Sequence, residues 1–107
     1  MNKLYKIEYY VPESHLEITK KALFEAGAGR IGNYDFCCWE TFGTGQFRPL
    51  AGSNPYKGKT DLTEKVKEYK VELVCAEEFL KASIKAMKQK HPYETPAYNY
   101  WPVNEAD

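Results

Sequence analysis

The sequence predicts an α+β fold of the ferredoxin-like type, a β-α-β-β-α-β sandwich with an antiparallel sheet and two helices on one face. Three observations predict it. Patterns typical of a strand, a helix, two strands, a helix and a strand follow one another along the chain. All seven glycines lie between positions 27 and 58, so regular structure concentrates in the two flanks. A length of 107 residues suits one domain, and we expect residues 1–107 to form it.

The first flank is predicted to contain a strand and a helix. Alternating residue types over 4–11 indicate the strand. Ser14 and Glu17 match a capping box, which predicts the start of a helix. The helix runs to about Ala26, with Gly27 as its left-handed stop. The residues expected on its buried face are Leu16, Thr19, Ala22, Leu23 and Ala26.

The rest of the chain is predicted to supply three strands and the second helix. Residues 34–42 carry apolar side chains on both faces, which indicates a strand covered on both sides. Residues 43 to about 63 form a loop too long for a simple hairpin connection, which indicates a functional or interface role. A third strand over 64–75, a helix over 77–90 and an aromatic strand over 97–103 complete the pattern.

Charge and composition exclude several function classes. Fifteen basic and fifteen acidic side chains cancel, so there is no basic surface for nucleic acid. No apolar run approaches the ~18 residues of a membrane span, and the first ten residues are too charged for a signal peptide. Three cysteines, with Cys37 and Cys38 adjacent, favour reduced thiols over a disulfide framework. We therefore expect a cytoplasmic protein with no nucleic-acid or membrane partner.

Two glycine motifs imitate nucleotide-binding sites. Residues 27–32 match G-x-G-x-x-G, but they close a helix, whereas a dinucleotide site needs these glycines to open one. Residues 52–60 resemble a phosphate-binding loop, but five residues separate the glycines where four are required. Both segments are predicted to be turns, and no cofactor is expected.

A third glycine segment is a stronger candidate for a functional site. It consists of Gly43, Thr44, Gly45, Gln46, Phe47, Arg48 and Pro49. Two glycines free the backbone to form an anion-binding concavity, and Arg48 could pair with a phosphate or carboxylate. The alternative, which we favour, is a bulge or a subunit-interface loop.

A turn beyond the second predicted helix brings together His91, Tyr93 and Glu94. An imidazole beside a carboxylate could act as an acid/base pair or as metal ligands. His15, His91 and Glu94 are the weak metal candidates, because the chain offers only two histidines and three cysteines. A rigid hydrogen-bonded turn is the preferred interpretation. No serine or cysteine shows a recognisable catalytic base, so no catalytic residue is assigned.

Four segments resemble a known family: residues 11–15, 27–34, 43–49 and 91–98. Together they are similar to the YqfO-type domain of the Nif-three-like family, also called YbgI, dinuclear-metal proteins or GTP cyclohydrolase homologues. The resemblance implies a fold like that of the PII and CutA proteins, which usually trimerise. It also implies that the metal ligands of longer members belong to a flanking domain outside this sequence. Metal binding and hydrolase activity are therefore not carried over.

The function expected from residues and resemblance is a non-enzymatic homo-oligomeric module, most simply a trimer. Its clefts between subunits would be lined by the segment 43–49 and the turn 91–94. The aromatic excess, 15% of all residues, supports self-association because two helices cannot cover that much apolar surface. Two alternatives remain open: a sensor of a small anion or nucleotide at those clefts, and divalent metal binding of the CutA type.

Overall fold

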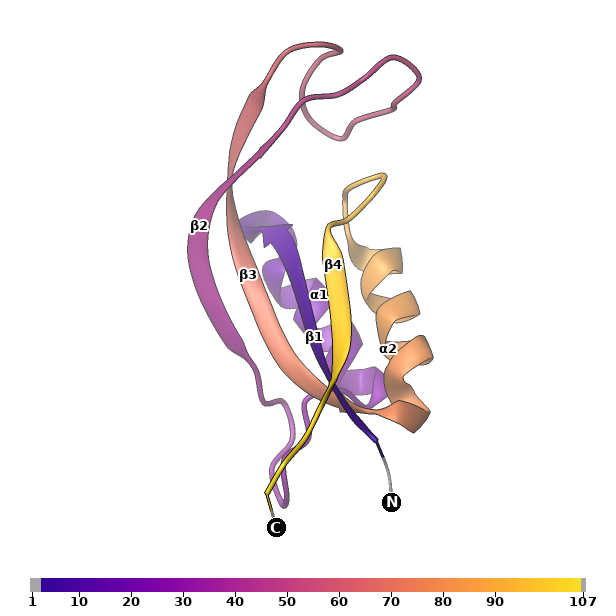
Figure 1. Ribbon diagram of the computed structural model, residues 1–107. Coiled ribbons are helices and arrows are strands. Elements are labelled where there is room, and N and C mark those ends of the chain that lie inside the picture. Colours follow the sequence, from indigo (N-terminus) through magenta and orange to yellow (C-terminus); the bar gives the residue numbers. More distant parts are fainter. Residues whose placement is uncertain (1–2, 107) are drawn as a thin grey trace.

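The computed structural model describes residues 3–106 and shows the predicted order of elements. The strands are β1 (Leu4–Pro12), β2 (Trp39–Phe47), β3 (Glu64–Ala76) and β4 (Tyr98–Val103). The helices are α1 (Leu16–Ala26), which follows a short 3₁₀ turn (Glu13–His15), and α2 (Glu77–Lys90). Within the described residues the strands form one antiparallel sheet in the order β2-β3-β1-β4 (Figure 1). The predicted ferredoxin-like class is confirmed.

The core lies between this sheet and the two helices, which cover the same face (Figure 1). Alternate residues of the two central strands point into it because side chains change face at each position. Its buried residues include Ile7, Tyr9, Val11, Leu16, Leu23, Val71, Leu73, Cys75, Leu80 and Met87. Neither helix of residues 3–106 is long and apolar enough to cross a membrane.

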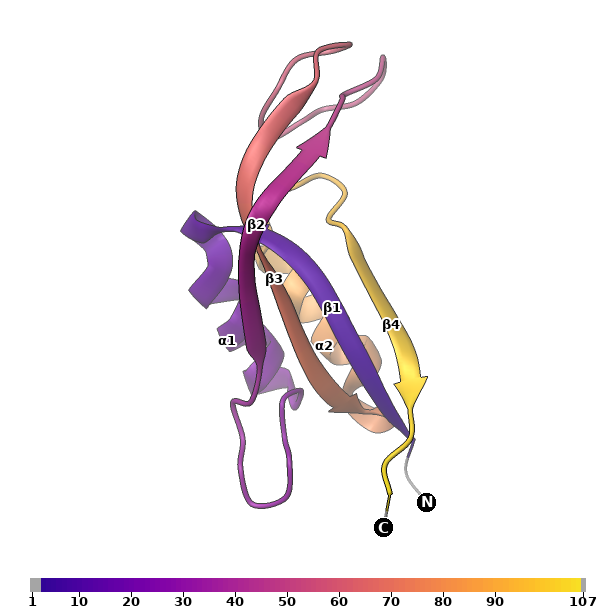
Figure 2. The ribbon, with the colours of Figure 1, turned by 60° about the vertical axis from the view of Figure 1, so that its left-hand side comes forward.

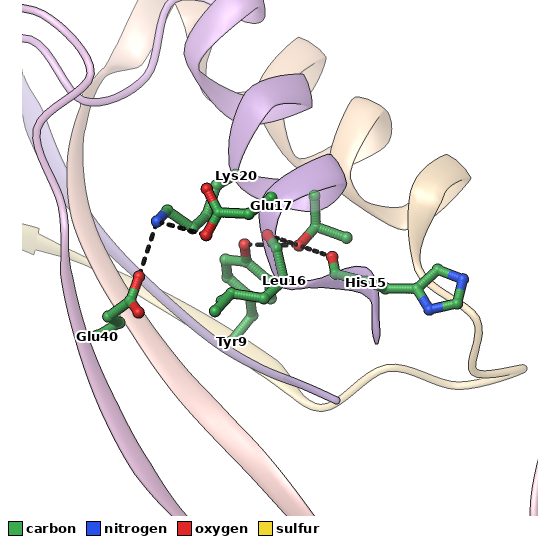
Figure 3. Close-up of polar contacts among 7 residues, drawn as sticks. Tyr9, His15, Leu16, Glu17, Lys20 and Glu40 are labelled. Atoms are coloured by element: carbon green, nitrogen blue, oxygen red, sulfur yellow. Dashed lines mark hydrogen bonds and ion pairs between the residues drawn. The ribbon is translucent and has the colours of Figure 1, made fainter. Parts of the chain in front are cut away.

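A polar pair inside the core ties β1 to α1. The Tyr9 hydroxyl lies 2.9 Å from Oγ1 of Thr19, and both residues are fully buried (Figure 3). Thr19 donates its own proton to the carbonyl of His15 at 2.8 Å, so Tyr9 is the donor toward Thr19. Burial raises the pKa of the Tyr9 hydroxyl far above its usual value of 10.0. The pair satisfies two polar groups where water cannot reach them.

The start of α1 differs from the prediction. Ser14 lies in the 3₁₀ turn and makes a 2.8 Å hydrogen bond with Nδ1 of His15, and no side chain of the described residues caps the helix. The capping box is therefore wrong, because the turn after β1 delays the start of the helix by one residue, so that His15 takes the N-cap position. Glu17 instead contacts Lys20, which also reaches Glu40 of β2 at 2.7 Å (Figure 3).

The end and buried face of α1 agree more closely with the prediction. Gly27 has φ 115° and ends the helix in the left-handed conformation, as expected. Phe24 is buried, whereas Ala22 and Ala26 are only half-buried. The buried face is therefore rotated toward Phe24, whose ring stacks on Phe36 with 4.8 Å between centroids.

The second strand begins and ends five residues later than predicted, at Trp39–Phe47. Residues 28–38 form a separate excursion, closed by an isolated bridge between Ile31 and Tyr34 (Figure 2). The predicted cover on both faces is also wrong for a single chain, because side chains on both faces of β2 are exposed. Trp39 remains 68% exposed and Phe42 54% exposed.

Strands β2 and β3 continue past the helices as a projecting hairpin, residues 43–68, which we call the arm (Figures 1 and 2). Their pairing extends to Phe47 opposite Glu64. The predicted loop over 43–63 is therefore corrected to residues 48–63, since its first five residues are paired strand. Backbone pairing with β3 outweighs the weak strand preference of the two glycines there.

Candidate functional site

A hollow of about 520 Å³ lies where the arm meets the turn after α2. Four residues of the glycine segment line it, Gln46, Phe47, Arg48 and Pro49, together with two from the turn, Tyr93 and Glu94. The two segments that the sequence singled out therefore meet within one chain. Gly43, Thr44 and Gly45 lie instead around a smaller neighbouring hollow of about 320 Å³.

Glu68 of β3 lines both hollows and is the residue that sequence reasoning missed. Its side chain is only 9% exposed. The Tyr93 hydroxyl donates to its Oε2 at 2.8 Å, and no other hydrogen bond or ion pair reaches the carboxylate from residues 3–106. In the sequence, the alternating lysines and glutamates of β3 indicate a strand face exposed to solvent. The burial of Glu68 becomes evident only from its pairing with Gly43 in the sheet.

Gly45 provides the space that the Glu68 carboxylate occupies. A Cβ added at Gly45 would overlap Oε1 of Glu68, whereas one added at Gly43 would meet nothing within 4 Å. Both glycines are paired strand residues. They therefore do not form the concave loop that the anion-binding interpretation requires, and the role of Gly45 is to admit a buried carboxylate.

His91 holds the turn after α2 in place. Its Nδ1 accepts the Tyr93 N–H at 3.1 Å, so Nε2 carries the proton and donates to the Tyr10 carbonyl at 2.7 Å. Burial lowers the pKa of His91 below its ordinary 6.5. Both ring nitrogens are occupied, which fits a rigid hydrogen-bonded turn.

The three weak metal candidates are not brought together. His15 bonds to Ser14, and Oε2 of Glu94 accepts the backbone N–H of Asn54 at 3.1 Å. Residues 3–106 contain no group of three or more histidine, cysteine, aspartate or glutamate side chains that could hold a metal ion.

Aromatic rings form part of the wall of the larger hollow, which Arg48 and Lys57 also line. The Tyr93 ring lies 6.0 Å from the Tyr56 ring and 6.5 Å from the Phe47 ring, between centroids. Desolvation and the Glu68 carboxylate raise the pKa of the Tyr93 hydroxyl well above 10.0, so it stays a donor. Arg48 is exposed at the rim, and no ion pair engages it within the described chain.

No family model matches this sequence. A protein of Halalkalibacterium halodurans named GTP cyclohydrolase 1 type 2 homolog is 43% identical over 105 residues, which are 97% of this chain and 28% of that protein. The crystal structure of a Bacillus cereus protein related to NIF3 superimposes with a TM-score of 0.85 at 36% identity, over 97% of this chain and 26% of the other. The chain is related to one segment of proteins of the NIF3 family. It spans little more than a quarter of these relatives.

Smaller proteins share the fold of this NIF3-related segment. CutA1 from Ehrlichia chaffeensis has a TM-score of 0.69 at 15% identity, over all of this chain and 87% of that protein. The Bacillus subtilis GlnK structure, a PII protein, has a TM-score of 0.62 at 13% identity, over 94% and 84%. The expected likeness to PII and CutA is confirmed at the level of the fold.

Proposed function

We propose that this chain is a non-catalytic module that assembles head to tail into a closed ring of copies, most simply a trimer. The observation that carries the proposal is that Trp39 and Trp101 stand at opposite edges of one uncovered sheet face. Trp39 lies on β2 and is 68% exposed, and Trp101 lies on β4 and is 40% exposed.

The strand register places these two residues on the same face. Trp39 pairs with Glu72, which pairs with Glu8 of β1. Trp101 pairs with Lys6, two positions from Glu8 and hence on the same side of the sheet. The helices cover the other face, so no helix of residues 3–106 covers this open face (Figure 2).

Two different exposed edges favour head-to-tail contacts between copies. An aromatic side chain left in water at a sheet edge is typical of an interaction site. The Trp39 edge of one copy would contact the Trp101 edge of the next, and the same contact would repeat around an axis. The copies form a closed ring when a whole number of these rotations makes one full turn. The arm at the β2 edge would then reach the neighbour, and the larger hollow would lie close to the contact between subunits.

The larger hollow supports binding better than catalysis. The serine that lines it, Ser53, donates its hydroxyl to the Leu50 carbonyl at 2.7 Å. The Tyr93 hydroxyl is held as a donor to Glu68. No nucleophile beside an available base lines it within residues 3–106, whatever activity the longer NIF3 proteins have.

Single substitutions at the two edges test the ring. Trp39→Glu and Trp101→Glu should each lower the mass measured by sedimentation, because a buried charge opposes the contact. Ile18→Glu is the control, since Ile18 is 46% exposed on α1, away from the open face. An equimolar mixture of the two tryptophan variants keeps one intact contact and should form a two-chain species. Unchanged masses for both variants would contradict the proposal.

A second candidate function is sensing of a small ligand in the larger hollow. The observation in its favour is that segments 46–49 and 93–94 converge on one cavity. The exposed guanidinium of Arg48 would suit a phosphate or nucleotide as ligand. Thermal shift with inorganic phosphate and ATP tests that form of the proposal, and Arg48→Ala should abolish any shift.

A further inference from the structure

Glu68 is a buried glutamate that forms no ion pair within the described chain. The residue is 9% exposed, and the partner of its carboxylate among residues 3–106 is the neutral hydroxyl of Tyr93. By contrast, the carboxylates of Glu8 and Glu64 each lie within 4 Å of a lysine ammonium group. A carboxylate so far removed from water is normally paired with a cation.

One oxygen of this carboxylate remains available. Oε2 accepts from Tyr93, while Oε1 has no donor among residues 3–106. No side-chain oxygen of the described residues is both fully buried and unpartnered, so Oε1 keeps contact with solvent. Glu68 also lines the larger hollow. A ligand that enters from solvent can therefore reach the charge.

The walls around this carboxylate suit an organic cation. Phe47, Tyr56 and Tyr93 line part of the hollow with aromatic rings, which attract ammonium and guanidinium groups. Lys57 also lines it, and its ammonium group lies 3.9 Å from the Glu64 carboxylate. Inorganic cations prefer several oxygen ligands, and the two carboxylates that line the hollow, Glu68 and Glu94, belong to no group of three or more potential metal ligands within residues 3–106. A volume of about 520 Å³ admits a stem of several carbons behind the charged group.

We propose that the larger hollow binds a small organic cation, an ammonium or guanidinium group on an apolar stem, with Glu68 as its counter-ion. The inference rests on the sensor function above and names its ligand class, and it holds for a single chain or a ring. Arg48 at the rim adds a second contact when the ligand also carries a carboxylate. The charge of this ligand is thus opposite to that of the anion for which the sequence made Arg48 a candidate.

Titration calorimetry with phenethylamine, agmatine and arginine, against inorganic phosphate and ATP, tests the proposal. Glu68→Gln keeps the shape and an acceptor for Tyr93, and should weaken amine binding by about tenfold or more. Glu25→Gln is the control, because Glu25 is an exposed glutamate of α1 that does not line the hollow, and it should change affinity by less than about threefold. If arginine binds more tightly than agmatine, Arg48→Ala should remove the difference.

The possible outcomes distinguish failure of the proposed ligand class from failure of the proposed sensor function. If phosphate or ATP binds and no amine does, the proposed organic cation is contradicted, while the proposed sensor function is supported. Failure of every probe at millimolar concentration would overturn both. If Glu68→Gln does not fold, Phe47→Leu replaces it, since loss of the ring should weaken amine binding while the carboxylate stays. Equal amine affinity in that variant and the parent would also overturn the proposal.

Discussion

The Tyr93 hydroxyl donates to Oε2 of Glu68 at 2.8 Å and so joins the turn after α2 to the base of the arm. The two residues are 25 positions apart in sequence, and both line the larger hollow. This hydrogen bond joins two separate segments of the chain in the wall of the hollow. It also places a donor on a carboxylate that has lost most of its water.

Tyr93→Phe should destabilise the chain by about 1.5–3 kcal/mol, because it removes the donor from a buried charged acceptor. Chemical denaturation measures the free energy of unfolding. Tyr56→Phe is the matched control, since the Tyr56 side chain is 56% exposed and its hydroxyl makes no hydrogen bond within residues 3–106. Equal effects of the two substitutions would show that the Tyr93–Glu68 bond contributes nothing.

Gly45→Ala should destabilise the arm by about 1–3 kcal/mol, because the new methyl overlaps the Glu68 carboxylate. Gly43→Ala is its control on the same strand face and should be neutral or stabilising by up to about 1 kcal/mol. The double variant Gly45→Ala with Glu68→Ala removes the overlap and should recover part of the loss. If Gly45→Ala lowers the free energy of unfolding equally with and without the Glu68 side chain, the loss comes from the backbone and not from the overlap.

Thr19→Val should cost about 1–3 kcal/mol, because it leaves the buried Tyr9 hydroxyl without a partner. Tyr9→Phe combined with Thr19→Val removes both polar groups, so the double variant should lose less than the sum of the single losses. Denaturant titrations of the four proteins give this coupling. Strict additivity would mean that the two hydroxyls do not interact.

His91 should make stability depend on pH. Burial lowers its pKa in the folded chain below the unfolded value near 6.5, so the unfolded state binds the proton first as pH falls. The free energy of unfolding should therefore be highest above pH 6.5 and decrease from there toward acid. His91→Gln retains a donor for the Tyr10 carbonyl, and its stability should fall less between pH 7.5 and 5.5. Parallel pH profiles would contradict this assignment.

The two flanks of the fold were predictable because each element carried its own local signal. Strand β1 shows alternation, and Gly27 ends α1 in the one conformation that glycine adopts most easily. Helix α2 has acidic residues in its first turn and lysines in its last. These signals depend on neighbours in the sequence, so no tertiary contact was needed to read them.

The boundaries of β2 and the role of Glu68 were not predictable in this way. Residues 43–47 look like a loop locally, and they become a strand because β3 pairs with them. Glu68 lies among exposed charges in the sequence, and it becomes buried because Gly45 and Tyr93 approach it from distant positions. The candidate site therefore combines residues that the motifs identified with a carboxylate that only the register reveals.

Light scattering of the chain over a dilution series tests the proposed ring most directly. The proposal predicts a mass of several chains, most simply three, that persists on dilution to low micromolar concentration. It also predicts that Trp39 and Trp101 lose solvent exposure together, which quenching of tryptophan fluorescence can follow. A single-chain mass throughout the series, with both tryptophans accessible to quencher, would contradict it.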